Sequence, residues 1–205
     1  MTQLLTSKRA KCINCGYPQL TCLCAWIKVI NSPVKIVILQ HPKEANHAKN
    51  TVKLLQLGLT NLEIIQGENA SDFKVFANTV SACPEKYVLC YPHSESKAIE
   101  TLKLEAEFAP TLVELETLIL IDASWRKALK MWHLNPWLQK LNSWHFAAPP
   151  QNKYTIRHTK QRNSLSTLES VAYLLNLTYA LDCGALLGLF EQMQARCFLN
   201  QRQKN

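Results

Sequence analysis

Short apolar runs rich in β-branched residues, separated by stretches with helical spacing, constrain the fold of this chain most strongly. We expect strands over residues 34–39, 62–65, 86–91 and 117–121, and a further short strand at 144–147. The spacing predicts helices over 45–57, about 95–107, 125–141 with a break near Pro136, 165–180 and about 184–200. Alternation of this kind predicts an α/β fold, with a mostly parallel sheet flanked by helices.

The composition excludes several classes of protein. With 205 residues, 47% of them hydrophobic and 19% charged, the chain can form a packed core and is not of the disordered class. It holds only five glycines and no G-x-G-x-x-G or Walker A pattern, so a nucleotide-like ligand must be held without a glycine-rich loop. No secretory segment and no membrane-length apolar run is visible, which predicts a cytoplasmic protein that does not contact a membrane.

Four of the eight cysteines cluster near the N-terminus with metal-ligand spacing. The pairs Cys12/Cys15 and Cys22/Cys24 form a C-x2-C and a C-x-C motif six residues apart, and Gly16 can supply an unusual backbone angle behind the first pair. Four thiolates satisfy tetrahedral zinc and leave no open position, so we expect a structural Zn²⁺ in a small N-terminal knuckle. Two disulfides or free thiols are the alternatives, and a reducing compartment disfavours the disulfides.

Positive charge is concentrated in one block of the chain. Residues 123–168 contain no Asp or Glu, and the remaining 15 cations of the chain are balanced by 15 acids. The cations of the block are Arg126, Lys127, Lys130, Lys140, Lys153, Arg157, Lys160 and Arg162. A basic stretch with interspersed aromatic residues is typical of nucleic-acid binding, although a generic solvated surface would look similar.

Polar residues follow three of the expected strands: Gln40-His41-Pro42, Tyr91-Pro92 and Asp122-Ala123-Ser124-Trp125. In open parallel sheets, ligands bind beyond the carboxyl ends of the strands. Asp122 could be a poised base, a ligand for a cationic group, or a helix cap, and Ser124 is another candidate cap. We expect Trp125, Trp132 and Trp137 to be core residues more readily than a base-stacking platform.

A helix start near residue 166 is the second candidate site. Ser164 or Ser166 can cap the following apolar helix, and Glu169 lies three residues after Ser166, as in a capping box. The free backbone N–H groups at such a start can also hold an anion or a carboxylate, and both interpretations can be true.

Taken together, these motifs resemble the DTW-domain family, the tRNA-uridine aminocarboxypropyltransferases. The family pattern combines the cysteine cluster, Q-H-P-x-E, Y-P, D-x-T-W and an I-R segment that precedes L-S-T-L-E. Here it stands as Cys12/Cys15/Cys22/Cys24, residues 40–44, Tyr91-Pro92, residues 122–125, Ile156-Arg157 and residues 165–169. Ser124 replaces the usual threonine of the family, which keeps the hydroxyl and loses the methyl group.

The resemblance implies transfer of the 3-amino-3-carboxypropyl group of S-adenosylmethionine to N3 of a tRNA uridine, by analogy in the variable loop, with release of methylthioadenosine. It also implies a SPOUT-like arrangement, and it leaves open whether the chain is knotted. Asp122 is then the expected base, or the ligand of the donor ammonium, with Ser124 and Trp125 beside it. The expected donor site is Leu89, Tyr91, Pro92, Ile121, Ala123, Arg157, Ser166 and Thr167. The expected RNA contacts are Arg126, Lys127, Lys130, Lys153, Lys160 and Arg162.

Two other functions fit the same residues. A SPOUT-like RNA methyltransferase would use the same donor but transfer its methyl group. A non-catalytic, zinc-containing RNA-binding protein would need only the knuckle and the basic block. We expect the knuckle to occupy residues 1–32 and the catalytic domain residues 33–205.

Overall fold

The computed structural model describes residues 10–47, 49–154, 156 and 164–199. Its centre is a six-stranded sheet of order β2-β1-β5-β3-β6-β4, in which each neighbouring pair is parallel. The strands are β1 (Lys35–Gln40), β2 (Leu62–Gln66), β3 (Tyr87–Cys90), β4 (Lys97–Ala98), β5 (Thr117–Asp122) and β6 (Asn142–His145). The expected parallel sheet is therefore confirmed, and its central strands β1 and β5 are almost completely buried, as apolar strands of a doubly covered sheet should be.

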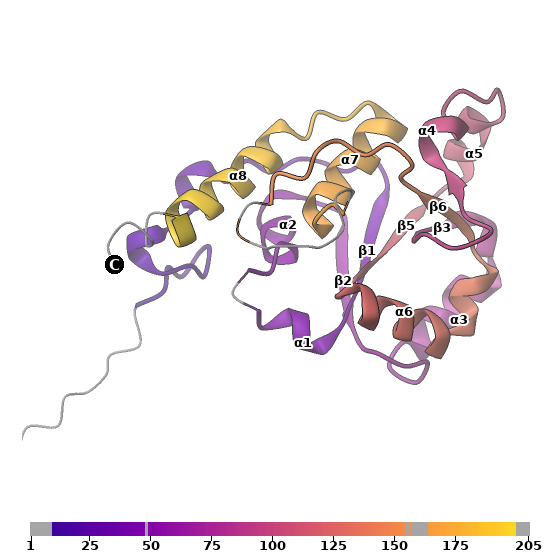
Figure 1. The fold of residues 1–205 in the computed structure, drawn as a ribbon, viewed down its shortest axis with the longest axis horizontal. Helices are drawn as coiled ribbons and strands as arrows, with labels where there is room; N and C mark the ends of the chain where they lie inside the picture. The colour runs from indigo at the N-terminus through magenta and orange to yellow at the C-terminus, as the bar shows by residue number, and fades with distance from the viewer. Residues whose placement is uncertain (1–9, 48, 155, 157–163, 200–205) are drawn as a thin grey trace, which may run out of the picture.

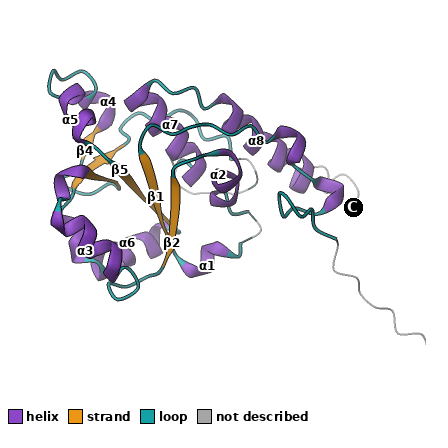
Figure 2. Ribbon diagram, turned by 180° about the vertical axis from the view of Figure 1, so that it is seen from behind, coloured by secondary structure: helices purple, strands orange, loops and turns teal. Residues whose placement is uncertain are grey.

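Helices cover both faces of the sheet (Figures 1 and 2). They are α1 (Pro42–Ala45), α2 (Val52–Gly58), α3 (Lys74–Ala82), α4 (Ile99–Leu102), α5 (Phe108–Glu114), α6 (Trp125–Leu134), α7 (Thr167–Tyr179) and α8 (Gly184–Gln194). Short 3₁₀ turns lie at Gln19–Thr21, Cys24–Trp26, Pro84–Lys86 and Pro136–Lys140, and Ala195–Leu199 is a π-helical extension of α8.

Alternate residues of β1 and β5 enter one of two apolar clusters. On one face, Ile36 and Leu118 pack with α2, α7 and α8, while on the other, Val37 and Ile119 pack with α3 and α6. This alternation follows from the two-residue side-chain period of a strand. No described helix combines the length and the hydropathy that a bilayer crossing requires.

Two of the expected helices are wrong in extent. Residues 45–57 form no single helix, because α1 ends at Ala45 and α2 begins at Val52. The side chain of Asn50 makes the break: its Nδ2 donates to the carbonyl of Ala45 and its Oδ1 accepts from the N–H of Val52. Such side-chain bonds compete with the helical ladder.

The stretch 95–107 contains β4, α4 and a turn instead of one helix. Strand β4 forms because Lys97 and Ala98 pair with Trp144 and His145, almost fifty residues away in the chain. Helices α3 and α5 were not expected from the sequence. The break at Pro136 is confirmed, since α6 ends before it and a 3₁₀ turn follows.

The cysteine-rich segment packs directly against the rest of the molecule. Cys15, Tyr17 and Leu23 are buried in the same apolar cluster as α2, α7 and α8. The Arg196 guanidinium lies 4.5 Å from the Trp26 ring centroid, and Lys53 Nζ of α2 donates to the carbonyl of Gly16 at 2.9 Å. The boundary at residue 32 stays a prediction, and across it the two parts share one core.

Candidate active site and metal centre

A cavity of about 170 Å³ opens at the carboxyl ends of β3, β5 and β6. Six residues expected from the sequence line it: Tyr91, Pro92, Ile121, Ala123, Trp125 and Thr167. Segments far apart in the chain thus meet beyond the strand ends, where ligands bind in sheets of this type.

Asp122 lies behind one wall of this cavity as the buried last residue of β5. Its Oδ2 accepts a hydrogen bond from Gln40 Nε2 at 2.9 Å, and its Oδ1 accepts one from Thr167 Oγ1 at 2.5 Å. Thr167 lines the cavity and stands between it and the carboxylate. Three sequence motifs therefore meet at one carboxyl group. They lie at the end of β1, at the end of β5 and at the start of α7.

The other expected site residues occupy different positions. Ser124 is the N-cap residue of α6, but its side chain makes no capping bond. Leu89 is fully buried in the cluster with α3 and α6 and does not line the cavity. Arg157, Lys160 and Arg162 lie outside the described residues.

Two of the expected tryptophans pack in the core, and the third lines the cavity. Trp132 is buried and stacked on Tyr91 at 5.3 Å, and Trp137 packs edge-to-face on Phe76, so both are core residues as expected. Trp125 is different, because 45% of it is exposed and it lines the cavity. Its Nε1 donates to Ser164 Oγ at 3.2 Å, which fixes the indole at the cavity mouth.

The expected capping box at the start of α7 is confirmed. Ser166 Oγ accepts from the N–H of Glu169, and Glu169 Oε2 accepts from the N–H of Ser166. The second oxygen, Glu169 Oε1, accepts from the N–H of Lys153 at 2.7 Å. The Glu169 carboxylate therefore joins the start of α7 to the segment that leaves the sheet after β6.

The structure adds His145 to the cavity, together with Phe146, Ser164, Leu165 and Ser170. Ser96 Oγ donates to the carbonyl of His93 at 2.7 Å and lies 2.9 Å from His145 Nδ1. Because the hydroxyl has one proton, which it donates to His93, the hydrogen bond between Ser96 and His145 has Nδ1 as its donor. The sequence could have indicated His145 as a site residue, because it lies at the carboxyl end of a strand, as Gln40 does.

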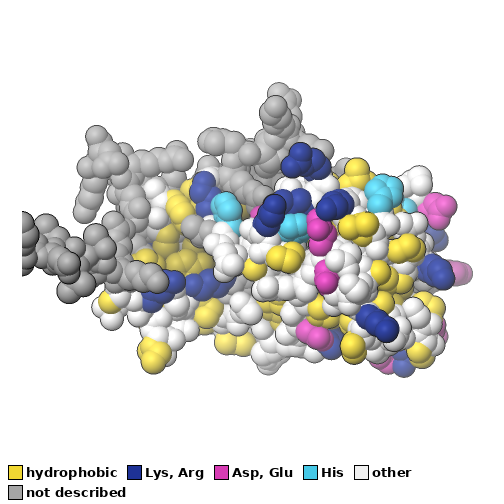
Figure 3. All heavy atoms as spheres, turned by 90° about the horizontal axis from the view of Figure 1, so that it is seen from below, with side chains coloured by type: hydrophobic (Ala, Val, Ile, Leu, Met, Phe, Trp, Pro, Cys, Tyr) yellow, Lys and Arg dark blue, Asp and Glu magenta, His cyan; other side chains and the backbone are white. Residues whose placement is uncertain are grey.

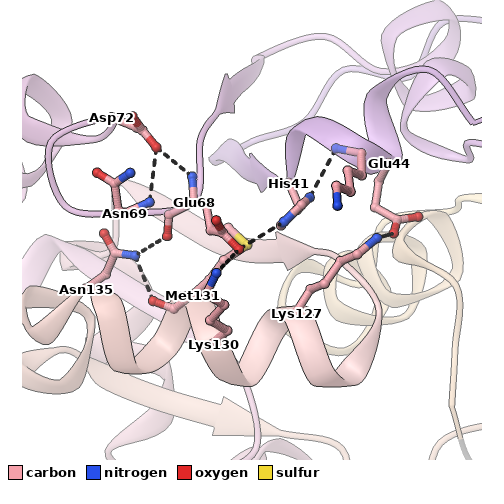
Figure 4. Close-up of polar contacts among 10 residues, drawn as sticks. His41, Glu44, Glu68, Asn69, Asp72, Lys127, Lys130, Met131 and Asn135 are labelled. Atoms are coloured by element: carbon pink, nitrogen blue, oxygen red, sulfur yellow. Dashed lines mark hydrogen bonds and ion pairs between the residues drawn. The ribbon is translucent and has the colours of Figure 1, made fainter.

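Ion pairs hold α6 to the segments that follow β1 and β2 (Figure 4). Lys127 Nζ lies 2.8 Å from Glu44 Oε1. One turn further along, Lys130 contacts Glu68 at 3.0 Å, and His41 Nε2 reaches the same oxygen at 3.2 Å. His41 Nδ1 accepts from the N–H of Lys43, so Nε2 is the donor to Glu68.

These contacts show that part of the positive charge of the block is paired with acids from elsewhere in the chain. Three of its four described lysines, Lys127, Lys130 and Lys153, pair with Glu44, Glu68 and Glu191, acids from outside the block, and the fourth, Lys140, is exposed. Figure 3 shows the resulting surface, on which Lys and Arg side chains are interspersed with acidic and histidine side chains. The side chain of Lys127 is 26% exposed, whereas those of Lys130 and Lys153 are 59% and 63% exposed. Arg126 is exposed.

The sulfurs of Cys12, Cys15, Cys22 and Cys24 lie within 4.8 Å of one another. The Cys12–Cys24 and Cys15–Cys22 sulfurs are 3.5 Å and 3.7 Å apart. A tetrahedral zinc with Zn–S bonds of about 2.3 Å separates its sulfurs by about 3.8 Å, so the four thiols fit this ion. Gly16 has a φ of +67°, as expected, and allows the turn behind the first pair.

Electrostatics also favour a cation among the four thiols. Hydrogen bonds from the backbone of Cys15 and Asn14 lower the pKa of Cys12 to about 6. Hydrogen bonds to Cys22 and Cys12 raise the pKa of Cys24 to about 12, because its proton is shared with neighbouring sulfurs. Ionisation of one thiol therefore opposes ionisation of its neighbours, and a bound cation would favour four thiolates together.

Comparison with known proteins supplies the family. The DTW domain model matches residues 9–198. A Mus musculus relative named tRNA-uridine aminocarboxypropyltransferase 2 is 26% identical over 93% of this chain, and the Drosophila melanogaster protein of that name is 30% identical over 82%. The chain spans less than two thirds of these relatives, 63% and 66% of their lengths. No solved structure matches. Because the domain model covers nearly the whole sequence, the chain belongs to the DTW-domain family.

Proposed function

We propose that this protein transfers the 3-amino-3-carboxypropyl group of S-adenosylmethionine to N3 of a tRNA uridine. The observation that carries the proposal is the cavity at the carboxyl edge of the sheet, where the Gln40, Asp122 and Thr167 motifs meet. The names of the relatives support the reaction and the class of substrate. By analogy we place the uridine in the variable loop and the protein in the cytoplasm.

The reaction needs one new bond, one broken bond and one proton acceptor. N3 of the uridine attacks the chain carbon next to the sulfonium, and the electron pair of that carbon–sulfur bond returns to sulfur to give neutral methylthioadenosine. The N3 proton leaves to a base. Three carbons flank the sulfonium, so the orientation of the donor in the cavity decides which group is transferred.

The cavity suits a donor held without a glycine-rich loop. Tyr91, Pro92, Ile121 and Ala123 provide an apolar wall, and Trp125 at the mouth can stack on adenine or on the extruded uridine. Asp122 serves either as the proton acceptor or as the group that orients the donor ammonium. Ser124 and Ser166 stay predicted contacts, with Arg157 as the predicted partner of a carboxylate or phosphate. A SPOUT-like knot also stays a prediction.

We place the tRNA on the exposed side of α6, next to Trp125. Exposed ion pairs contribute at most about 1 kcal/mol, so Lys130 and Lys153 can exchange their glutamates for phosphates at little cost. Arg126 is exposed and follows Trp125, which lines the cavity. Lys127 is too enclosed for this role. Lys160 and Arg162 remain proposed contacts.

Zinc at the four cysteines has a structural role in this proposal. Cys12, Cys15, Cys22 and Cys24 would all be ligands, so no position stays open for substrate. The ion supplies the positive charge that keeps four thiolates together. The N–H of Leu23 already donates to Cys15 Sγ at 3.5 Å, which orients that sulfur.

Incubation of the protein with unmodified tRNA and S-adenosylmethionine tests the function. We expect methylthioadenosine among the products and an aminocarboxypropyl-uridine by mass spectrometry of the nucleosides. S-Adenosylhomocysteine would instead identify a methyltransferase, and tRNA binding without turnover would identify a non-catalytic RNA-binding protein.

A matched pair of variants tests the site. Asp122→Ala should abolish turnover and retain tRNA affinity. Glu116→Ala alters a surface acid that pairs with Lys86, just before the opposite end of β5, and should leave turnover unchanged. Normal turnover by the Asp122 variant would remove this carboxyl group from the mechanism.

A further inference from the structure

Thr167 presents a hydrogen-bond acceptor to the cavity because its only hydroxyl proton is already used. Its Oγ1 donates to Asp122 Oδ1 at 2.5 Å, a length typical of a charge-assisted O–H···O⁻ bond. The other carboxylate oxygen accepts from Gln40 Nε2, so the network is consistent with an ionised Asp122. Both lone pairs of Thr167 Oγ1 are still available and can only accept, and Thr167 lines the cavity.

From this hydrogen-bond arrangement we infer that Thr167, backed by Asp122, is the subsite that binds the ammonium group of the donor's amino-acid chain. The inference rests on the proposed function and chooses between the two roles that were open for Asp122. A threonine oxygen whose proton is held by a carboxylate carries extra negative charge, and it favours a cationic N–H over a neutral one.

The surroundings of Thr167 support this choice. Tyr91, Ile121 and Trp125 form the apolar part of the cavity wall, and an ammonium placed against that part would lose hydration without compensation. Asp122 itself is buried and does not line the cavity, so its charge reaches the ligand through Thr167. Asp122 is thus a positioning residue, and its hydrogen bonds to Gln40 and Thr167 link the end of β1 to the start of α7.

Three ligands separate this subsite from general binding. They are S-adenosylmethionine, an analogue whose chain keeps the carboxylate but lacks the amino group, and methylthioadenosine, which lacks the chain altogether. Calorimetric titration of the full chain should show that S-adenosylmethionine binds about tenfold or more tighter than the desamino analogue, the difference expected for a hydrogen bond between a charged group and its acceptor.

Substitutions at Thr167 should change the ratio of the affinity for S-adenosylmethionine to the affinity for the desamino analogue. Thr167→Val is isosteric and should reduce the preference for the amino group to within about threefold, while methylthioadenosine binds as before. Thr167→Ser keeps the hydroxyl and should retain the preference. Ser170→Ala removes another cavity-lining hydroxyl one turn further along α7 and should leave the ratio unchanged.

Two results would overturn the inference alone. One is an unchanged preference for the amino group in Thr167→Val. The other is an equal loss of affinity for all three ligands in that variant, which would mark Thr167 as a structural residue. If the unaltered protein binds neither S-adenosylmethionine nor methylthioadenosine, the proposed function itself fails, and the two failures are therefore distinguishable.

Discussion

Replacing Lys127 by methionine should destabilise the protein and leave its affinity for tRNA unchanged, whereas replacing the adjacent Arg126 should do the reverse. The two residues are neighbours at the start of α6, and sequence alone assigns both to RNA binding. In the structure, Lys127 is enclosed and lies 2.8 Å from Glu44, whose side chain is only 10% exposed. Figure 4 shows this pair bridging α6 and α1.

The cost follows from the burial of the pair. Exposed ion pairs contribute about 0–1 kcal/mol, and breaking a fully buried pair costs about 3–5 kcal/mol. The Glu44–Lys127 pair lies between these limits, so we expect a loss of about 2 kcal/mol. In a domain of this length that corresponds to about 4–8 °C in Tm. Methionine keeps most of the aliphatic stem, so the loss reports mainly on the charge.

RNA binding should respond in the opposite way. If Arg126 contacts one phosphate, its replacement by methionine should reduce the slope of log K against log salt by about 0.7–0.9. Thermal unfolding and tRNA titrations at several salt concentrations measure both quantities on the same two variants. An equal decrease of the salt slope in both variants, or an unchanged Tm for Lys127→Met, would refute the separation of structural from RNA-facing cations.

Three further outcomes are expected. Removing the metal with a chelator should lower the Tm and release about one zinc per chain, because Cys15 and Leu23 belong to the main apolar cluster; an unchanged Tm after loss of the ion would contradict a structural role. Glu169→Gln should lower the free energy of unfolding, measured with urea, by about 1–3 kcal/mol. The carboxylate of Glu169 accepts from two backbone N–H groups, whereas an amide offers one oxygen. Stability equal to that of the unaltered protein would count against the double contact. Hydrogen bonds from Lys130 and then His41 hold the pKa of Glu68 below its ordinary 4.5. The contribution of Glu68 to folding stability is therefore complete above pH 4.5 and disappears as the pH falls through the lower pKa of the folded state. Glu68→Gln should flatten the acid limb of a Tm–pH profile, and an acid limb identical to that of the unaltered protein would exclude this group.

Local patterns in the sequence were sufficient for most of the secondary structure. The strand at 117–121 and the helix start at Ser166 were predicted because an apolar run and a capping box are complete within a few residues. The cluster of four cysteines was predicted for the same reason, since two short cysteine motifs lie within thirteen residues. The helix expected at 45–57 failed because one side chain, Asn50, replaces the helical hydrogen bonds.

The tertiary structure decided which of these pieces meet. Asp122 bonds to Gln40, 82 residues before it, and to Thr167, 45 residues after it, and no local pattern contains such a pairing. The same holds for charge: the block without acids looks uniformly basic along the chain, yet Glu44 and Glu68 come from other segments to pair with its lysines. Periodicity and spacing report what neighbours along the chain can form, whereas sheet order and register place distant side chains within bonding distance, and it is this placement that makes the cavity.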